Sequence, residues 1–391
     1  MQEYTKRAAY ISIILLGIVS LMGDIVYEGA RADISPYLEF LGASAIIVGL
    51  VGGLGEFVGY AIRLLSGYLA DTTRAYWLFT FMGYGLIIAI PLLALSKTWQ
   101  IAALLVIVER LGKALRSPSR DTILSMVSRG VGSGRAFGIH ETLDQIGAIA
   151  GPLLVGFLML YTENNYPKVF ATLSIPFLIM IFALFFTYKH IGRLTEVKKE
   201  EGVRSVKIEK LNRNFYLYSA AVLFNTLGLI NILLITFKAS QILPMEEKWI
   251  VPMIFVIIQG VDASIAFISG YTYDKIGIKF LMVPFILSIF PSLITLISKD
   301  LSMIILACVF FGVVLGMQES IYRAVIADMT PLDSRGTAYG IFNTVYGLGL
   351  LGGGVVYGLF INYGTDIVLI AAYAVLAQIV AISLLMRCKI R

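Results

Sequence analysis

Long apolar runs occur along the whole chain, and they constrain its fold more than any other feature. Each is about 18 to 25 residues long, the length of helix that crosses the hydrocarbon core of a bilayer. Charged residues are only 14% of the 391-residue chain and hydrophobic residues are 58%, whereas soluble domains carry about 25% charged residues. The pattern predicts an all-α integral membrane protein with twelve spans, at residues 8–31, 43–66, 77–95, 99–116, 136–160, 168–187, 214–237, 249–269, 279–297, 301–321, 337–361 and 367–386.

Lysine and arginine are concentrated in alternate connections between these spans. One side holds both termini and the long basic segment 188–213, whereas the other holds only Lys97, Lys168, Lys238, Lys248 and Lys299. The positive-inside rule therefore predicts that both termini and this segment are cytoplasmic. The net charge of +6 is explained by the basic residues in the connections that this rule places in the cytoplasm. No basic soluble domain is present that would favour nucleic-acid binding.

The two halves of the chain resemble each other. "GYLADTTRAYW" begins at Gly67 and "GYTYDKIGIKF" at Gly270, so that Asp71 and Asp274 are 203 positions apart. The repeat predicts a six-helix bundle at residues 1–187, a cytoplasmic linker at 188–213 and a second bundle at 214–391. Parallel repeats on either side of a central site are typical of transporters that work by alternating access.

These loops carry a family resemblance. "GYLADTTR" and "GYTYDKIG" are similar to the loop after the second span in the major facilitator superfamily, and the resemblance covers essentially the full chain. It implies the twelve-helix fold of that family, membership of a prokaryotic subgroup without a transferable substrate, and an intracellular gate. The candidate gate residues are Gly67, Asp71, Arg74, Arg120, Asp121, Gly270, Asp274, Lys275 and Arg323.

Within that gate, Arg120 and Asp121 are expected to bridge to the Asp71 loop, with plain surface charge pairs as the alternative. Pro118 is expected to end the fourth span, because proline has no amide hydrogen to donate inside a helix. Arg323 is expected to act on Asp274 in the same way.

The fifth span resembles the family's antiporter motif at Gly138, Gly147, Gly151, Pro152 and Gly156. The resemblance implies proton-driven export, especially of drug-like solutes. Glycines at this spacing also allow a second helix to approach closely. The fourth span, with "ERLGKALR", is similar to a motif that the family associates with proton coupling.

Ionisable residues inside the spans are functional candidates, because burying a charge in a bilayer costs free energy. The candidates for an intramembrane charge network are Asp24, Glu28, Glu56, Arg63, Glu109, Arg110, His140, Glu141 and Asp144. Asp24 or Glu56 with Arg110 is the preferred set for proton coupling. Static ion pairs that fix helix packing, and recognition of a charged substrate, remain as alternatives.

Polar and aromatic residues near these charges, together with those in the second half, are candidates for a substrate cavity. They are Tyr27, Arg31, Phe57, Asn225, Asn231, Gln259, Asp262, Gln318, Glu319 and Asn343. Packing or lipid contact is the alternative role for any single aromatic residue.

An enzyme is not expected. "HETLD" places His140 and Asp144 one helical turn apart around Glu141, as in a metal site, but no third ligand accompanies them. Three roles remain open for His140: a pH sensor, a gate partner, or a buried imidazole whose ring nitrogens are hydrogen-bonded.

The predicted function is a proton-coupled exporter of a small organic solute, with uptake of a metabolite and a transporter-like sensor as alternatives. We expect a monomer in the prokaryotic plasma membrane, with the bilayer and a small molecule as its partners and no cofactor or metal.

Overall fold

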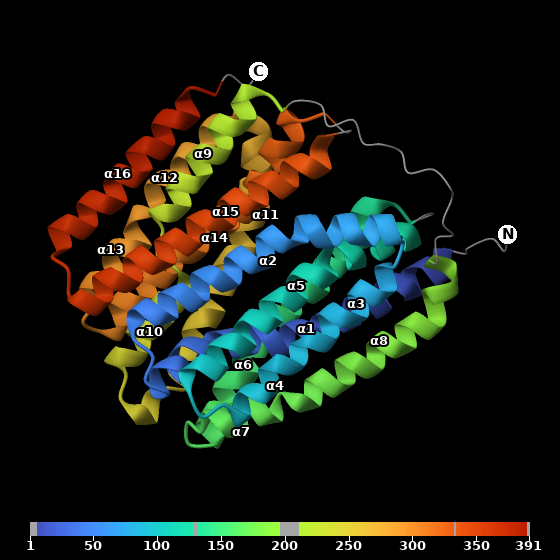
Figure 1. Ribbon diagram of the computed structural model, residues 1–391, viewed down its shortest axis with the longest axis horizontal. Helices are drawn as coiled ribbons and strands as arrows, with labels where there is room; N and C mark the ends of the chain where they lie inside the picture. The colour runs from blue at the N-terminus through green and yellow to red at the C-terminus, as the bar shows by residue number, and fades with distance from the viewer. Residues whose placement is uncertain (1–5, 129–130, 196–210, 332–333, 389–391) are drawn as a thin grey trace. The chain divides into compact units, whose positions relative to one another are not determined.

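The chain folds into helices joined by short connections, and no strand occurs among the residues that the structure describes (Figure 1). The structure is a computed structural model that describes residues 6–128, 131–195, 211–331 and 334–388. The α-helices are α1 (Lys6–Phe40), α2 (Ala45–Thr73), α3 (Tyr76–Gly85), α4 (Ala89–Leu92), α5 (Trp99–Val127), α6 (Ser133–Tyr161), α7 (Tyr166–Thr172), α8 (Ser174–Thr195), α9 (Arg213–Leu227), α10 (Ile232–Ile242), α11 (Ile250–Ile276), α12 (Met282–Leu287), α13 (Ile289–Ile297), α14 (Leu301–Met329), α15 (Arg335–Tyr363) and α16 (Ile367–Met386). Short 3-10 segments lie at Leu86–Ile88, Leu93–Leu95, Met245–Glu247 and Gly277–Leu281.

Ten helical segments of the described chain are long and apolar enough to cross a membrane. One of them, Ile250–Ile297, has 48 residues and contains α11, α12 and α13, so its length suffices for two crossings. Helix α5 is not among the ten, and it carries several charged residues, including Glu109 and Arg110. The predicted fold class, an all-α membrane protein, is thus confirmed, and the count of twelve stays a prediction.

Contacts divide the chain into two compact units. Unit 1 comprises Met1–Arg31 and Ile62–Arg204, and unit 2 comprises Ala32–Ala61 and Ser205–Arg391. Residues 32–61 thus group with the second half, although the repeat places them in the first. The physical reason is a close helix contact inside unit 2, where Gly49 and Gly53 of α2 face Gly354 and Leu351 of α15. The repeat-based boundaries themselves stay a prediction.

Two helices extend beyond the predicted membrane spans. Helix α1 continues past residue 31 to Phe40, because the segment from Ala32 to Leu38 is buried and is held helical by packing. Helix α8 runs to Thr195, where Trp77 Nε1 of α3 donates a hydrogen bond of 2.8 Å to Thr195 Oγ1. The first part of the predicted linker is therefore helix, and residues 196–210 lie outside the described residues.

Helix α5 also continues where a break was expected, at Pro118. A proline inside a helix leaves the carbonyl four residues earlier without its amide donor. That carbonyl belongs to Ala114, and the hydroxyl of Ser66 on α2 donates to it over 2.7 Å in a buried position. A side chain from a neighbouring helix thus replaces the missing donor, as is common for prolines in membrane helices.

The donor role of the Ser66 hydroxyl can be tested by mutation. Ser66→Ala should lower the free energy of unfolding by about 1–3 kcal/mol, the cost of leaving a buried carbonyl without a donor. The measurement is the melting temperature of the purified protein in detergent. Pro118→Ala restores an amide hydrogen at residue 118, so Ser66→Ala should cost much less in that background. Equal costs in both backgrounds would contradict the donor role.

Candidate functional site

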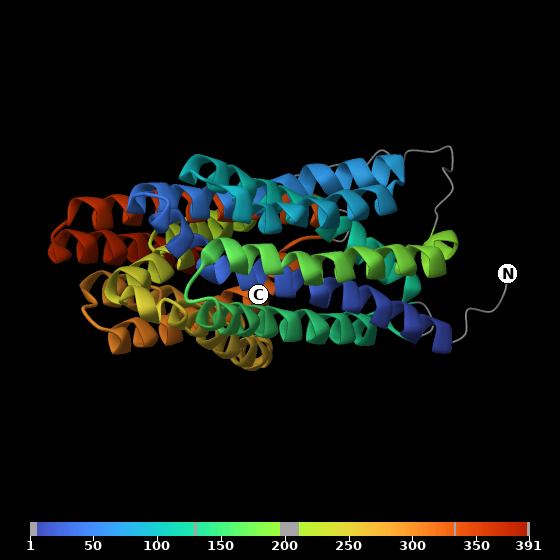
Figure 2. The same cartoon turned by 90° about the horizontal axis from the view of Figure 1, so that it is seen from below.

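Acidic and basic side chains of α1, α5 and α6 lie against one another in unit 1, and Tyr84 of α3 lies beside them. Figure 1 labels these four helices, and Figure 2 shows the same coloured ribbon after a turn of 90°. Glu28 of α1 is bonded to Lys113 of α5 over 3.3 Å and to Arg31 over 3.5 Å. Glu109 of α5 is 3.2 Å from Arg110 Nε. These groups form one part of the intramembrane charge network.

The second part of the network surrounds Arg120. Its guanidinium is bonded to Asp121 over 2.9 Å and to Asp144 of α6 over 3.4 Å, and it also donates to Ser20 Oγ over 3.2 Å. His140 Nε2 lies 3.0 Å from the same Ser20 hydroxyl, and His140 Nδ1 lies 3.5 Å from Asp144. Both ring nitrogens of His140 therefore have a neighbour, which favours the satisfied-imidazole interpretation.

Asp24 lies between these two parts. It is 4% exposed, and the groups that act on it electrostatically include Asp144, Glu28 and Lys113, with Tyr27 as a hydrogen-bonding neighbour. Asp24, which is buried, and Asp144, which is half-buried, are thus two carboxylates in one neighbourhood. A buried carboxylate beside another is a group that can bind and release a proton when its access to water changes.

Tyr27 lies beneath two cations rather than in an open cavity. Lys113 Nζ is 4.8 Å and the Arg116 guanidinium carbon 4.7 Å from the centroid of the Tyr27 ring, which is the geometry of a cation–π contact. The ring is 8% exposed. Its contacts join α1 to α5, so Tyr27 orders the charge network.

The small residues of α6 allow α1 to approach closely. A β-carbon at Gly147 would lie 2.6 Å from the Leu21 carbonyl oxygen, and one at Gly151 would lie 2.8 Å from the Gly29 amide nitrogen. Gly147, Gly151, Pro152 and Gly156 are all buried. Gly138 is exposed with open space beside it, so it takes no part in this contact. Close packing against α1 is thus observed at Gly147 and Gly151, and the role of the whole motif stays a prediction.

Two arginines of the predicted pairings form other contacts. Arg110, predicted beside Asp24 or Glu56, forms an ion pair with Glu109 on its own helix, and its part in proton coupling stays a prediction. Arg120 was expected to reach the Asp71 loop, but it binds Asp121 and Asp144. The reason is that α5 continues through Pro118, so residue 120 stays on the helix and faces α6. Glu56 and Arg63 are half-buried on α2, and Glu141 is exposed on α6.

The remaining gate residues lie at exposed helix ends. Asp71 accepts a hydrogen bond of 2.9 Å from Tyr76, to which Arg74 also donates over 3.2 Å. A β-carbon added at Gly67 would lie 3.5 Å from the side chain of Pro118, so the two residues are neighbours. In the second repeat, Lys275 lies over the Tyr271 ring and Gly270 lies beside Ser320. Asp274 and Arg323 are exposed. The gate function stays a prediction.

In unit 2, Asn225 is the centre of a buried hydrogen-bond network rather than an open cavity residue. Its amide nitrogen donates to Gln378 over 2.8 Å and to Ser288 over 3.0 Å, while its oxygen accepts from Tyr322 over 2.6 Å and from Gln318 over 2.9 Å. Since its polar atoms are occupied within the protein, Asn225 holds α9, α14 and α16 together. Gln318 belongs to the same network, because its amide nitrogen donates one of these hydrogen bonds to Asn225.

The other candidate cavity residues have varied surroundings. Asn231 caps α10 through a hydrogen bond of 2.9 Å from the Leu233 amide. Asp262 is buried, Glu319 is exposed, and Phe57, Gln259 and Asn343 are half-buried. Arg31 is bonded to Glu28. Their contact with a substrate stays a prediction.

Sequence reasoning missed several members of the site. Lys113, Arg116, Ser20 and Tyr84 all contact network residues, and Tyr84 lies 2.8 Å from Ser20. Outside this site, a buried acidic residue of unit 2, Asp33, was also missed. It is fully buried, and neither of its carboxylate oxygens has a hydrogen-bond partner among the described residues. The signal that could have found Asp33 and Lys113 is their charge within an apolar helix.

The metal alternative has no support in the described residues, where no group of three histidine, cysteine, aspartate or glutamate side chains could hold an ion. Long apolar helices that enclose a buried charge network are the architecture of a multi-span membrane transporter. Residues 9–385 match the family model of the Major Facilitator Superfamily, and the chain belongs to this family.

Relatives of known sequence extend over nearly the whole chain. An uncharacterised protein of Mycobacterium bovis is 34% identical over 379 residues, which cover 95% of this chain and 92% of the relative. An uncharacterised MFS-type transporter of Methanocaldococcus jannaschii is 29% identical over 344 residues, with 86% and 85% covered. The multidrug resistance protein MdtH of Proteus mirabilis is 26% identical over 174 residues, or 44% of this chain and 43% of its own length.

Solved structures show the same fold at low sequence identity. The crystal structure of the peptide transporter POT in complex with sulfate has a TM-score of 0.76 and 14% identity. The match covers 96% of this chain and 93% of that one. The chain is thus a multi-span membrane transporter of this family, and its substrate requires a separate argument.

Proposed function

We propose that this transporter is a proton-coupled antiporter that exports a small organic or drug-like solute by alternating access. The observation that carries the proposal is the neighbourhood of Asp24 and Asp144 within the buried charge network. Asp144 also contacts Arg120, a permanent cation that competes with protons for the carboxylate. Protons are the coupling ion in this proposal, and no cofactor is required.

Export is favoured by the antiporter-type glycine pattern of α6 and by the similarity of part of the chain to MdtH. The same charge network is compatible with a symporter that imports a metabolite. A membrane sensor built on a transporter fold is the alternative from a different class. For each of these functions we propose a monomer in a prokaryotic plasma membrane, with both termini in the cytoplasm. We propose no enzymatic activity.

The direction of coupling can be measured in two steps. A thermal-shift screen of the purified protein against metabolites and drug-like compounds first identifies a ligand. Proteoliposomes that contain this ligand and a trapped pH-sensitive dye then report both fluxes under an imposed proton gradient. An antiporter moves the solute against the direction of the proton, whatever the orientation of the protein in the vesicle. Parallel fluxes would establish a symporter, and ligand binding without flux would favour a sensor.

A further inference from the structure

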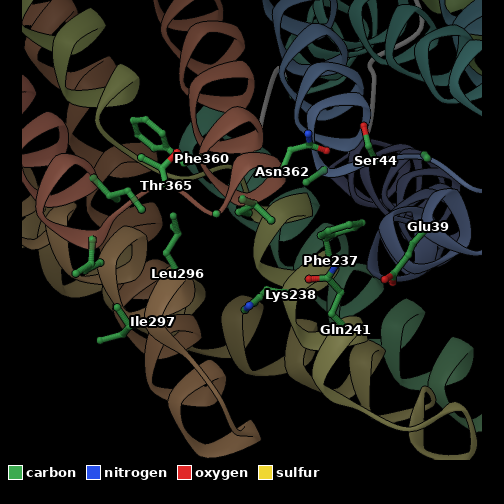
Figure 3. Close-up of a pocket in the computed structure, with 16 residues that line it drawn as sticks. Glu39, Ser44, Phe237, Lys238, Gln241, Leu296, Ile297, Phe360, Asn362 and Thr365 are labelled. Atoms are coloured by element: carbon green, nitrogen blue, oxygen red, sulfur yellow. The ribbon is translucent and has the colours of Figure 1, made fainter.

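A pocket of about 430 Å³ lies within unit 2, beside the start of α16 (Figure 3). Its walls are formed by the end of α1, the α1–α2 turn, α10, the end of α13, the end of α15 and the start of α16. The volume lies in the range of small-molecule sites, which is about 300–1,000 Å³. The charge network of unit 1 contributes no residue to it.

Two opposite charges line this pocket. Glu39 comes from the end of α1 and Lys238 from α10, and in Figure 3 they lie on either side of Phe237 and Gln241. The side chain of neither residue forms a hydrogen bond or an ion pair within the described part of the chain. Both residues are half-buried, so their side-chain charges lie at the wall of a partly desolvated space.

Lys248 is the other cation near Glu39, and its ammonium group is already engaged. Lys248 Nζ donates to Ser240 Oγ over 2.7 Å and also to the Ser240 carbonyl oxygen. Burial lowers the pKa of Lys248, and the carboxylate of Glu39 opposes that shift from a distance. The carboxylate of Glu39 thus remains available to a ligand cation.

The rest of the pocket is divided between polar and apolar walls. Gln241, Asn362 and Thr365 supply amide and hydroxyl groups, whereas Leu296 and Phe360 supply apolar surface. The apolar side continues to the outside of the helices, where Ile297 is 43% exposed and Ile367 is 40% exposed. In a protein of this class such exposed aliphatic side chains face lipid.

We propose that this pocket binds a zwitterion, with its anionic group on Lys238 and its cationic group on Glu39. A zwitterion neutralises both side chains and brings no net charge toward the membrane, whereas a simple anion or cation leaves one of them unpaired. The head group of an aminophospholipid and a free zwitterion of similar size share this chemistry. The lipid-facing opening accommodates acyl chains in the first case.

Occupancy of the pocket has a mechanical consequence within unit 2. Glu39 belongs to α1, and Ser44 lies in the turn before α2, whereas Lys238 and Asn362 belong to α10 and α15. A ligand that bridges these residues therefore holds the α1–α2 turn against helices of the second repeat. The site is separate from the proposed proton-coupling groups, so its test does not depend on transport.

The test measures binding of two zwitterionic probes to the purified, delipidated full-length protein in detergent by calorimetry. The probes are glycerophosphoethanolamine and dihexanoyl-phosphatidylethanolamine, and dihexanoyl-phosphatidylglycerol serves as the anionic comparison. We expect the phosphatidylethanolamine to bind at least about tenfold more tightly than the phosphatidylglycerol. Binding of glycerophosphoethanolamine as well would identify the head group alone as sufficient. Binding of only the acylated probe would identify a phospholipid as the occupant.

Variants assign the binding to the pocket. Glu39→Gln and Lys238→Met should each weaken binding of the phosphatidylethanolamine by about tenfold or more. Glu247→Gln and Lys299→Met, which change exposed residues outside the pocket, should leave it unchanged. Melting temperatures of all four variants verify that the protein is folded. Absence of zwitterion binding at millimolar concentration, equal binding of the phosphatidylglycerol, or unchanged binding in both pocket variants would overturn the proposal.

Discussion

Replacing Asp24 with asparagine should abolish transport driven by a proton gradient, with a loss of at least about tenfold in initial rate, while ligand binding persists. An asparagine amide has nearly the shape of the aspartate side chain but cannot bind and release a proton. Asp24 is 4% exposed and shares its neighbourhood with Asp144. Asp144→Asn should therefore also reduce coupled transport, and it removes the ion pair with Arg120 as well.

The measurement is solute flux in proteoliposomes with and without an imposed pH gradient. Glu163→Gln provides the control, because Glu163 is an exposed carboxylate beyond the C-terminal end of α6 and outside the charge network. The control should retain the response to the gradient. If Asp24→Asn and Asp144→Asn both keep the full response of the unmodified protein, the assignment of proton coupling to these two residues is wrong. Static packing would then be the better account of the charge network.

Replacing Gly354 with valine should also reduce transport by at least about tenfold, for a steric reason. Within unit 2, a β-carbon at Gly354 would collide with the Gly49 carbonyl oxygen of α2, and one at Gly53 would lie 2.7 Å from Leu351 Cα. Backbone atoms this close cannot accommodate extra methyl groups, and overpacking typically costs about 1–3 kcal/mol. Contacts between helices of opposite repeats must form and break in an alternating-access cycle.

Gly260→Val is the matched control, since Gly260 lies in α11 with open space beside it. We expect this control to transport at the rate of the unmodified protein. A fluorescence-detected melting curve separates loss of the α2–α15 contact from general unfolding. Full transport by a folded Gly354→Val protein would show that this close contact is not needed in the cycle.

Several features of the fold were predictable because they depend on local sequence. The apolar runs indicate membrane helices, since a bilayer requires each span to bury its own backbone hydrogen bonds. The glycines of α6 indicate close helix packing, and Gly147 and Gly151 do contact α1. The family could also be inferred from sequence, because the loop motifs that begin at Gly67 and Gly270 are short and contiguous.

The pairing of charges was less predictable. Helical spacing indicates that Asp24, Glu28 and Arg31 share a face, and Glu28 does bind Arg31. It does not indicate which neighbouring helix that face meets, or at what rotation and depth. For that reason the sequence did not reveal that Lys113 reaches Glu28 or that Arg120 reaches Asp144.

By itself, the sequence determined the membrane class, the repeat, the family and the positions of most helices, because each depends on composition or on short contiguous motifs. Only the tertiary structure decided which polar and charged groups form hydrogen bonds or line a common site. Ser66 of α2 replaces the donor missing at Pro118 by donating to a carbonyl of α5. Asn225 is hydrogen-bonded by Gln318 of α14, by Gln378 of α16 and by Ser288 between α12 and α13. Glu39 and Lys238, nearly two hundred residues apart, line the same pocket. Such contacts depend on how helices distant in sequence are rotated against each other, which no local pattern specifies.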